Sequence, residues 1–167
     1  SSGTVYAEIG ILKGEATISK NIDIWYRIIE ENQTTDNIIL EGNIKSKVFN
    51  SKCYLELEVS NIKSWHFNTP NLYSLIIAIG QKLVLTDHHK TNFGFRSIKT
   101  DNRKLLFNGE PVRLPGLEWM PGSFPEHGMA ETIEQKEKML NLLKNTNAVL
   151  TRFHWQQDEH ILEWCDR

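Results

Sequence analysis

The sequence has few of the residues that cross-link a fold or hold a metal ion. Only two cysteines, Cys53 and Cys165, occur among its 167 residues. Cys53 lies in a strand pattern and Cys165 in a helix pattern, so we predict two free buried thiols rather than a disulfide. No pair of cysteines has zinc-ligand spacing, and His88-His89 lacks a partner of the HExxH type. We therefore expect no metal and no cofactor, and we interpret His88-His89 as a solvated turn.

The sequence also lacks a strong charge of one sign, a long hydrophobic run and a leader. A formal net charge of −2 gives no electrostatic reason to expect a nucleic-acid partner. The most apolar stretch, "LYSLIIAIG", is far shorter than the roughly 20 residues of a membrane-spanning helix, so we expect no membrane partner. The first residues, "SSGTVYAEIG", show neither a basic start nor a long apolar core, and no signal peptide is predicted. Localisation stays open.

Before about residue 100 the sequence alternates with a period of two residues. In "CYLELEV", Leu55, Leu57 and Val59 fall on one face of a strand, with two glutamates on the other. The run "IDIWYRI" places its isoleucines and Tyr26 on one face in the same way. Further strands follow in "TDNIILEGNIK" and "NLYSLIIAIG", separated by Asn, Gly, Ser or Pro. Several short strands without a convincing helix predict a two-sheet sandwich of the immunoglobulin type.

After residue 100 the pattern changes. In "KLLFNGEPVRL", Asn108-Gly109 between two apolar runs predicts a tight hairpin that reverses the chain over Phe107–Glu110. Thr132 and Gln135 fit a capping box, and the apolar spacing that follows predicts a helix over 132–145. "NAVLTRF" is then typical of a strand, and "DEHILEWCDR" of a helix capped by Asp158. Strand "VRLPG", helix, strand and helix form a βαβα series, which implies parallel strands. Because a parallel sheet normally has both faces covered, we expect the sequence to be a piece of a larger domain.

Several motifs occur along the sequence in a characteristic order. They are Trp65, "TPNLYSL", "FGFRSI", "LLFNGEPVRLPG", a helix, and finally "NAV…H…CDR". In this order they resemble the family 2 glycoside hydrolases, which include β-galactosidases, β-glucuronidases and β-mannosidases. The resemblance covers residue 60 to the end, and residues 1–60 match only in character, as sandwich strands.

The resemblance implies a fold and an activity. Residues 1–98 would form the immunoglobulin-like β-sandwich, and residues 99–167 a β-hairpin and the first two βα units of a TIM (β/α)8 barrel. The family usually carries a jelly-roll domain before the sandwich, which is expected in the full chain together with the rest of the barrel. Its members cleave terminal β-linked sugars with retention, which requires two carboxyl groups about 5 to 5.5 Å apart. By resemblance both catalytic glutamates follow later barrel strands, so we expect residues 1–167 to be inactive alone.

What these residues would contribute is part of the substrate pocket. Active sites of (β/α)8 barrels lie at the carboxyl ends of the strands, where "GLEWMPG" and "TRFHW" fall. His154 matches the histidine of the family's "SHYP" motif, and its spacing to Cys165-Asp166 also agrees. By resemblance His154 donates to hydroxyls of the terminal sugar; a structural rim histidine is the alternative. Arg152 shares its strand face while Phe153 points away, and Arg152 is interpreted either as a sugar contact or as half of an ion pair.

Three further residues complete the predicted substrate-binding set. Trp155 stands where the family has tyrosine, and its indole would stack on a pyranose or pack beneath the next helix. Glu118 would accept a sugar hydroxyl or pair with Arg152, and a role as the catalytic carboxylate is not expected. Trp119 precedes "MP", and "EWMP" shares its Trp and Pro with the β-mannosidase form.

Two classes of function remain open at this point. The first is a retaining exo-β-glycosidase with a carbohydrate substrate, most similar to β-galactosidases, with a β-mannosidase as the alternative within the family. The second is a sandwich module that binds a carbohydrate or a protein without chemistry. The βαβα tail favours the enzyme, because a self-contained sandwich has no use for parallel strands.

Overall fold

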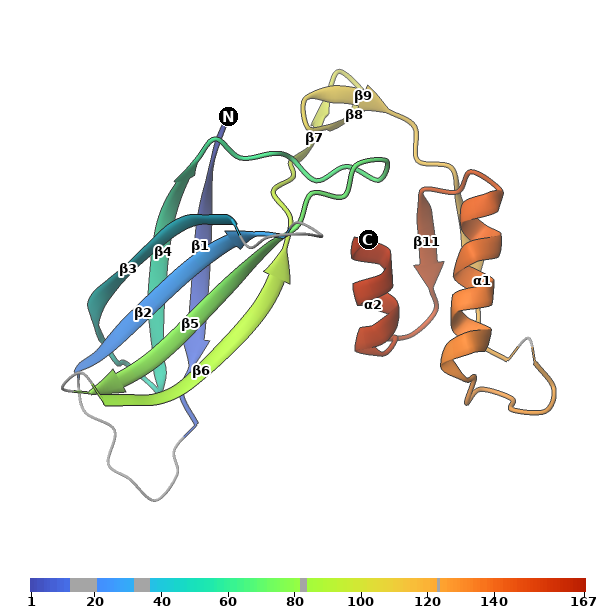
Figure 1. Ribbon diagram of the computed structural model, residues 1–167. Helices are drawn as coiled ribbons and strands as arrows, with labels where there is room; N and C mark the ends of the chain where they lie inside the picture. The colour runs from blue at the N-terminus through green and yellow to red at the C-terminus, as the bar shows by residue number, and fades with distance from the viewer. Residues whose placement is uncertain (13–20, 32–36, 82–83, 123) are drawn as a thin grey trace. The chain divides into compact units, whose positions relative to one another are not determined.

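The computed structural model describes residues 1–12, 21–31, 37–81, 84–122 and 124–167. Contacts divide the chain into two compact units, Ser1–Phe95 and Arg96–Arg167. The boundary between the units falls three residues before the predicted one. Figure 1 shows the strands of the first unit and the mixed elements of the second.

The first unit consists of antiparallel strands in two sheets, as the alternation predicted. One sheet pairs β1 with β4, and the other has the order β3-β2-β5-β6. The strands are β1 (Ser2–Gly10), β2 (Asn21–Glu30), β3 (Asn37–Lys47), β4 (Lys52–Ser60), β5 (Tyr73–Gln81) and β6 (Val84–Phe93). Every second side chain of β4 is buried from Cys53 to Val59, so one face of this strand meets the core and the other meets solvent.

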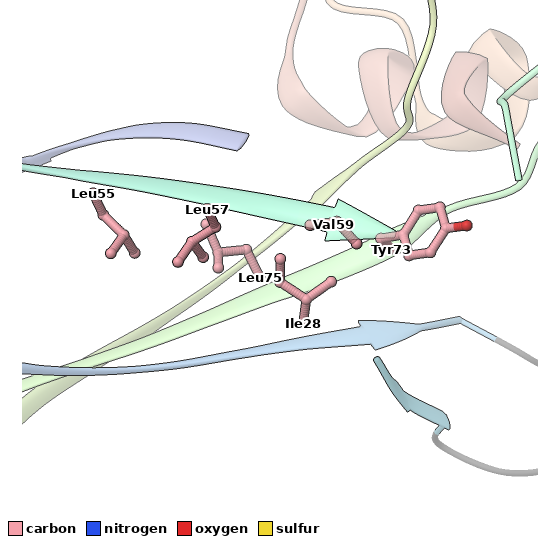
Figure 2. Close-up of a cluster of buried hydrophobic side chains, with 6 residues drawn as sticks. All are labelled: Ile28, Leu55, Leu57, Val59, Tyr73 and Leu75. Carbon is pink, nitrogen blue, oxygen red and sulfur yellow. The ribbon is translucent and has the colours of Figure 1, made fainter. Parts of the chain in front are cut away.

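The core of the first unit lies between the two sheets. Figure 2 shows the apolar side chains of β4 pointing toward those of β2 and β5. Its fully or nearly fully buried members are Ile28, Leu55, Leu57, Val59, Tyr73 and Leu75. At one end of this core, Tyr73 packs edge-on against Phe95, with ring centroids 5.1 Å apart, and its hydroxyl accepts a hydrogen bond from the Lys63 backbone N–H at 2.7 Å. The hydroxyl is therefore satisfied although the ring is fully buried.

The second unit begins with the predicted hairpin. Strands β7 (Ile98–Asp101), β8 (Lys104–Phe107) and β9 (Glu110–Val112) form an antiparallel sheet. Asn108 and Gly109 between β8 and β9 have φ values of 51° and 88°, as the turn requires. The Asn108 side-chain oxygen accepts a hydrogen bond from the Ser97 N–H at 2.9 Å, which ties the turn back to the start of the sheet.

Two parallel strands and two helices make up the remainder. Strand β10 (Gly116–Trp119) pairs in parallel with β11 (Leu150–Phe153), and α1 (Ile133–Asn145) connects them. Helix α2 (Glu159–Asp166) follows β11. Trp119, Leu140 and Ile161 are the buried centre of this unit, and the rings of Trp119 and Phe153 meet edge-on at 5.6 Å. One face of the strand pair is therefore covered by the helices.

Both helices begin where the sequence predicted. The Thr132 hydroxyl accepts from the Gln135 N–H, and the Gln135 side chain accepts from the Thr132 N–H, which is the predicted capping box. Asp158 caps α2 by accepting from the Ile161 N–H at 3.3 Å, and it also forms an ion pair with Lys136 of α1. These two contacts hold the pKa of Asp158 below its ordinary value, with the bond from Lys136 as the larger cause.

Three local predictions were wrong. The first parallel strand is Gly116–Trp119 rather than "VRLPG", because Val112 pairs with Leu105 and so belongs to the hairpin. His88 and His89 lie within β6 rather than in a turn, because β6 continues the antiparallel ladder of β5 past them. Cys53 is buried as predicted, whereas Cys165 is exposed.

The core between the sheets predicts the effect of truncating β4. Changing Leu57 to Ala removes buried methyl groups from the centre of the cluster in Figure 2 and leaves a cavity. We expect the free energy of unfolding to fall by about 3 kcal/mol, measured by urea denaturation. The control is Glu56→Ala on the solvent face of the same strand, which should change it by about 0.5 kcal/mol or less. Equal losses for the two variants would contradict the assignment of the two faces.

A second prediction concerns Glu30, a nearly buried carboxylate at the end of β2. Its Oε1 pairs with Lys63 and its Oε2 accepts from the Asn37 amide at 3.3 Å, so its pKa is lowered from 4.5, mainly by the bond from Lys63. The same contact raises the pKa of Lys63 from 10.5. A carboxylate with a lowered pKa adds stability that is present above its ordinary pKa and lost as the pH falls through the lowered one. Because the pKa of Lys63 is raised, the stability that this lysine contributes is present below pH 10.5 and is lost as the pH rises through the raised pKa.

We therefore expect Glu30→Gln to lower the free energy of unfolding most between pH 4.5 and 10.5. The difference from the wild type should shrink as the pH falls below 4.5. Denaturation curves of both proteins over this pH range provide the measurement. Glu41→Gln, in an ion pair exposed to solvent, is the control and should show a smaller effect. A difference that stays constant down to the acid limit would rule out the ion pair as its source.

Candidate functional site

The candidate site lies on the face of the β10–β11 pair that points away from the helices. Glu118 of β10 stands directly opposite Arg152 of β11 in the parallel register, and Trp119 stands opposite Phe153. Because neighbouring residues of a strand point to opposite faces, Glu118 and Arg152 lie on one face and the two aromatics on the other. This confirms that Phe153 points away from Arg152.

Glu118 is the common partner of two cationic or polar side chains. Arg152 Nη1 donates to Glu118 Oε1 in an ion pair, and His154 Nδ1 lies 3.6 Å from the same oxygen. The three side chains are between 44% and 60% exposed, so the cluster faces solvent and remains open to a ligand. A carboxylate that accepts from an arginine can orient that guanidinium for further hydrogen bonds, since arginine has five donors.

Trp155 lies next to this cluster. It is 41% exposed, and its ring meets that of His154 edge-on, with centroids 5.1 Å apart. The Gln157 side-chain amide donates to the Trp155 carbonyl at 3.2 Å, shortly before the Asp158 cap of α2. The indole therefore has free surface beside the histidine, as a residue that stacks on a sugar requires.

Trp119 has a different position from the other predicted site residues. It is 3% exposed and packs with Leu140 and Ile161 beneath the helices. Strand alternation cannot bring both Glu118 and Trp119 to the same face, so the indole of Trp119 has no surface available to a ligand beside Glu118. We leave Trp119 out of the site that we propose.

Sequence reasoning did not single out Glu131, which lies in the loop between β10 and α1. It is 6% exposed, and its Oε1 accepts from the Gly122 N–H at 3.0 Å across the loop between β10 and α1. This bond joins the two ends of the loop that follows Glu118 and Trp119. An acidic residue directly before the helix cap Thr132 was the available signal, because a negative charge is favourable at a helix N-terminus.

The described ranges contain no group of three or more His, Cys, Asp or Glu side chains placed to hold a metal ion. No described helix has the length and the apolar character needed to cross a membrane.

The fold is shared with solved carbohydrate-active enzymes. A glycosyl hydrolase family 2 member from Bacteroides cellulosilyticus is 19% identical with a TM-score of 0.81, over 99% of this chain and 21% of that protein. The β-glucuronidase of Parabacteroides merdae is 17% identical with a TM-score of 0.78, over 99% of this chain and 21% of that protein. At these identities the likeness concerns the fold alone.

The sequence relates the chain to the same group. Residues 1–96 match the family described as glycosyl hydrolases family 2. The β-galactosidase of Actinobacillus pleuropneumoniae is 32% identical over 123 residues, which are 72% of this chain and 12% of that protein. The chain belongs to family 2 of the glycosyl hydrolases. It spans 11% to 15% of the length of the curated relatives it matches.

The Gly122–Glu131 bond generates a prediction about the loop before α1. Changing Glu131 to Ala removes the nearly buried carboxylate that accepts from the Gly122 N–H, and we expect a loss of about 1–3 kcal/mol in the free energy of unfolding. Hydrogen exchange of the Gly122 amide should become faster at the same time. Glu131→Gln keeps an oxygen acceptor and should retain most of the protection. Glu126→Ala, in the exposed part of the loop, is the matched control; slow Gly122 exchange in Glu131→Ala would show that this bond does not close the loop.

Proposed function

We propose that this chain forms part of a retaining exo-β-glycosidase that removes terminal β-linked sugars. Membership of the family supports this reading, as do its relatives that are named β-galactosidases. The name shared by these relatives favours a β-galactoside as substrate. A β-mannoside is the alternative, suggested by the Trp and Pro of "EWMP".

In this proposal, residues 99–167 begin a (β/α)8 barrel that follows the sandwich of residues 1–98. The parallel pair β10–β11, with a helix after each strand, has the βαβα order of such barrels. The helices cover only one face of the pair, and a barrel would bury the opposite face, which carries Glu118 and Arg152, within its ring of strands.

The observation that carries the proposal is the cluster of Glu118, Arg152 and His154 at the strand ends. Barrel enzymes hold their substrates at the carboxyl ends of the strands, and these three side chains meet there. A sugar hydroxyl both donates and accepts, so it can donate to Glu118 and accept from Arg152 or His154. Trp155 beside His154 adds an aromatic surface for the apolar face of the ring.

The cluster binds and orients in this proposal and does not perform the chemistry. A retaining mechanism needs an acid/base and a nucleophile about 5 to 5.5 Å apart, across the scissile bond. The cluster contains the carboxylate of Glu118, which is engaged by Arg152. We therefore assign neither catalytic carboxylate to this cluster, and the carbohydrate is the only partner that we propose for it.

His154 provides the sharpest test of this function. A donor to a sugar hydroxyl stabilises the transition state when its bond tightens as the ring flattens toward an oxocarbenium-like state. In the β-glycosidase that contains these residues, His154→Ala should lower kcat/KM by about 10²-fold, the scale observed when a positioned donor is removed. Steady-state kinetics with chromogenic β-galactosides and β-mannosides provide the measurement and compare the two sugars.

The melting temperature separates this role from a structural one. His154 is half exposed, so its removal should leave the melting temperature close to that of the wild type. His88→Ala, on an exposed strand of the sandwich, is the matched control and should leave both quantities unchanged. Normal kcat/KM with a lowered melting temperature would assign His154 to the structure and remove it from the site.

A further inference from the structure

A second surface with binding chemistry lies on the outer face of the sheet β3-β2-β5-β6. Trp25 of β2 stands between Asn43 of β3 and Ala78 of β5 in the register, and Arg27 stands between Glu41 and Ile76. Ile24 and Ile28, which alternate with them, are fully buried, so these side chains point away from the core. Together with Tyr26 and Gly42, these six residues line a groove of about 560 Å³, which is within the range of about 300–1,000 Å³ that is typical of ligand pockets. We call it the outer groove.

The indole of Trp25 is the aromatic side chain of the outer groove that stands beside β5. Its neighbours on β5 are small: Ala78 stands directly opposite it, and a Cβ placed on Gly80 would lie 3.0 Å from Cζ3 of the indole. The ring therefore lies against the backbone of β5, at a point where a larger residue would displace it. Trp25 is only partly buried there, so it leaves aromatic surface facing outward.

The rim of the outer groove is polar and carries no net charge. Arg27 Nε donates to Glu41 Oε2 at 3.0 Å, and the two side chains are 49% and 56% exposed. Arginine has five N–H donors and a carboxylate has two oxygens, so the pair retains both donors and acceptors for a ligand. Asn43, exposed beside the indole, adds a further donor and a further acceptor.

We propose that the outer groove binds a neutral carbohydrate chain. A pyranose offers an apolar face to the indole and a ring of hydroxyls to the rim, and each hydroxyl can both donate and accept. The balanced charge of Arg27 and Glu41 favours a neutral glycan over an acidic one, because the attraction of an acidic glycan to the arginine would be offset by its repulsion from the glutamate. An apolar peptide is disfavoured, since it would cover the half-exposed ion pair without replacing its hydrogen bonds to water.

This site is separate from the one proposed for hydrolysis. Its residues come from β2, β3 and β5 of the first unit, and the cluster around Glu118 comes from β10 and β11 of the second. A groove on a sheet face would hold a polysaccharide to the protein and would take no part in bond cleavage. The proposal therefore stands whether or not the hydrolytic role is correct.

Affinity electrophoresis of the 167-residue chain in gels that contain soluble polysaccharide tests the proposal. The panel consists of neutral galactan, galactomannan and β-glucan, together with acidic polygalacturonate. We expect retardation by at least one neutral polymer and weaker or no retardation by polygalacturonate. Trp25→Ala should weaken binding about tenfold or more, as removal of an aromatic anchor does. Trp25→Tyr, which keeps an aromatic face, should restore most of it.

The controls keep the result interpretable. Tyr6→Ala removes an aromatic that is 74% exposed on β1, in the other sheet, and should bind like the wild type. Asn43→Ala should weaken binding without affecting the core. This variant therefore still tests the proposal if Trp25→Ala does not fold. No retardation by any neutral polymer, or equal retardation of the wild type, Trp25→Ala and Asn43→Ala, would overturn the proposal. Stronger retardation by polygalacturonate would overturn the assignment to neutral sugars.

Discussion

The position of β2 between β3 and β5 is the constraint on which the first unit depends. Because β2 pairs on both sides, a shift of one residue would exchange its two faces and break two ladders of hydrogen bonds at once. The observed register sends Ile24 and Ile28 into the core and sends Trp25 and Arg27 outward. One strand thus sets both the packing between the sheets and the composition of the outer groove.

Features with a local cause could be predicted from the sequence. The turn at Asn108-Gly109, the capping box of Thr132 and the Asp158 cap each depend on residues at most three positions apart. The alternation of β4 is equally local, because a strand that packs on one face only must alternate between apolar and polar residues. The meeting of Glu118 with Arg152 could be anticipated as well, since parallel neighbours end at the same edge of a sheet.

Features with a distant cause could not be predicted in this way. Whether Cys165 is buried depends on what covers its side of α2, and the helix pattern alone does not contain that information. The outer groove depends on Gly80 and Ala78, which are about fifty residues from Trp25 and are placed beside it only by strand pairing. The position of Trp119, in contrast, could have been predicted. Neighbouring residues of a strand point to opposite faces, so the rule that separates Phe153 from Arg152 in β11 also separates Trp119 from Glu118 in β10.

Asp158 links two events that are usually separate, the start of one helix and its attachment to another. Its carboxylate accepts the Ile161 N–H at the start of α2 and also pairs with Lys136 of α1. A helix of eight residues is too short to persist in water without support from packing. The residue that caps the first turn of α2 is therefore also paired with a charge on α1. Because Leu140 of α1 and Ile161 of α2 pack in the same core, the two helices should form and melt as one cooperative unit. Asp158 thus ties the start of α2 to the helix against which its buried face packs.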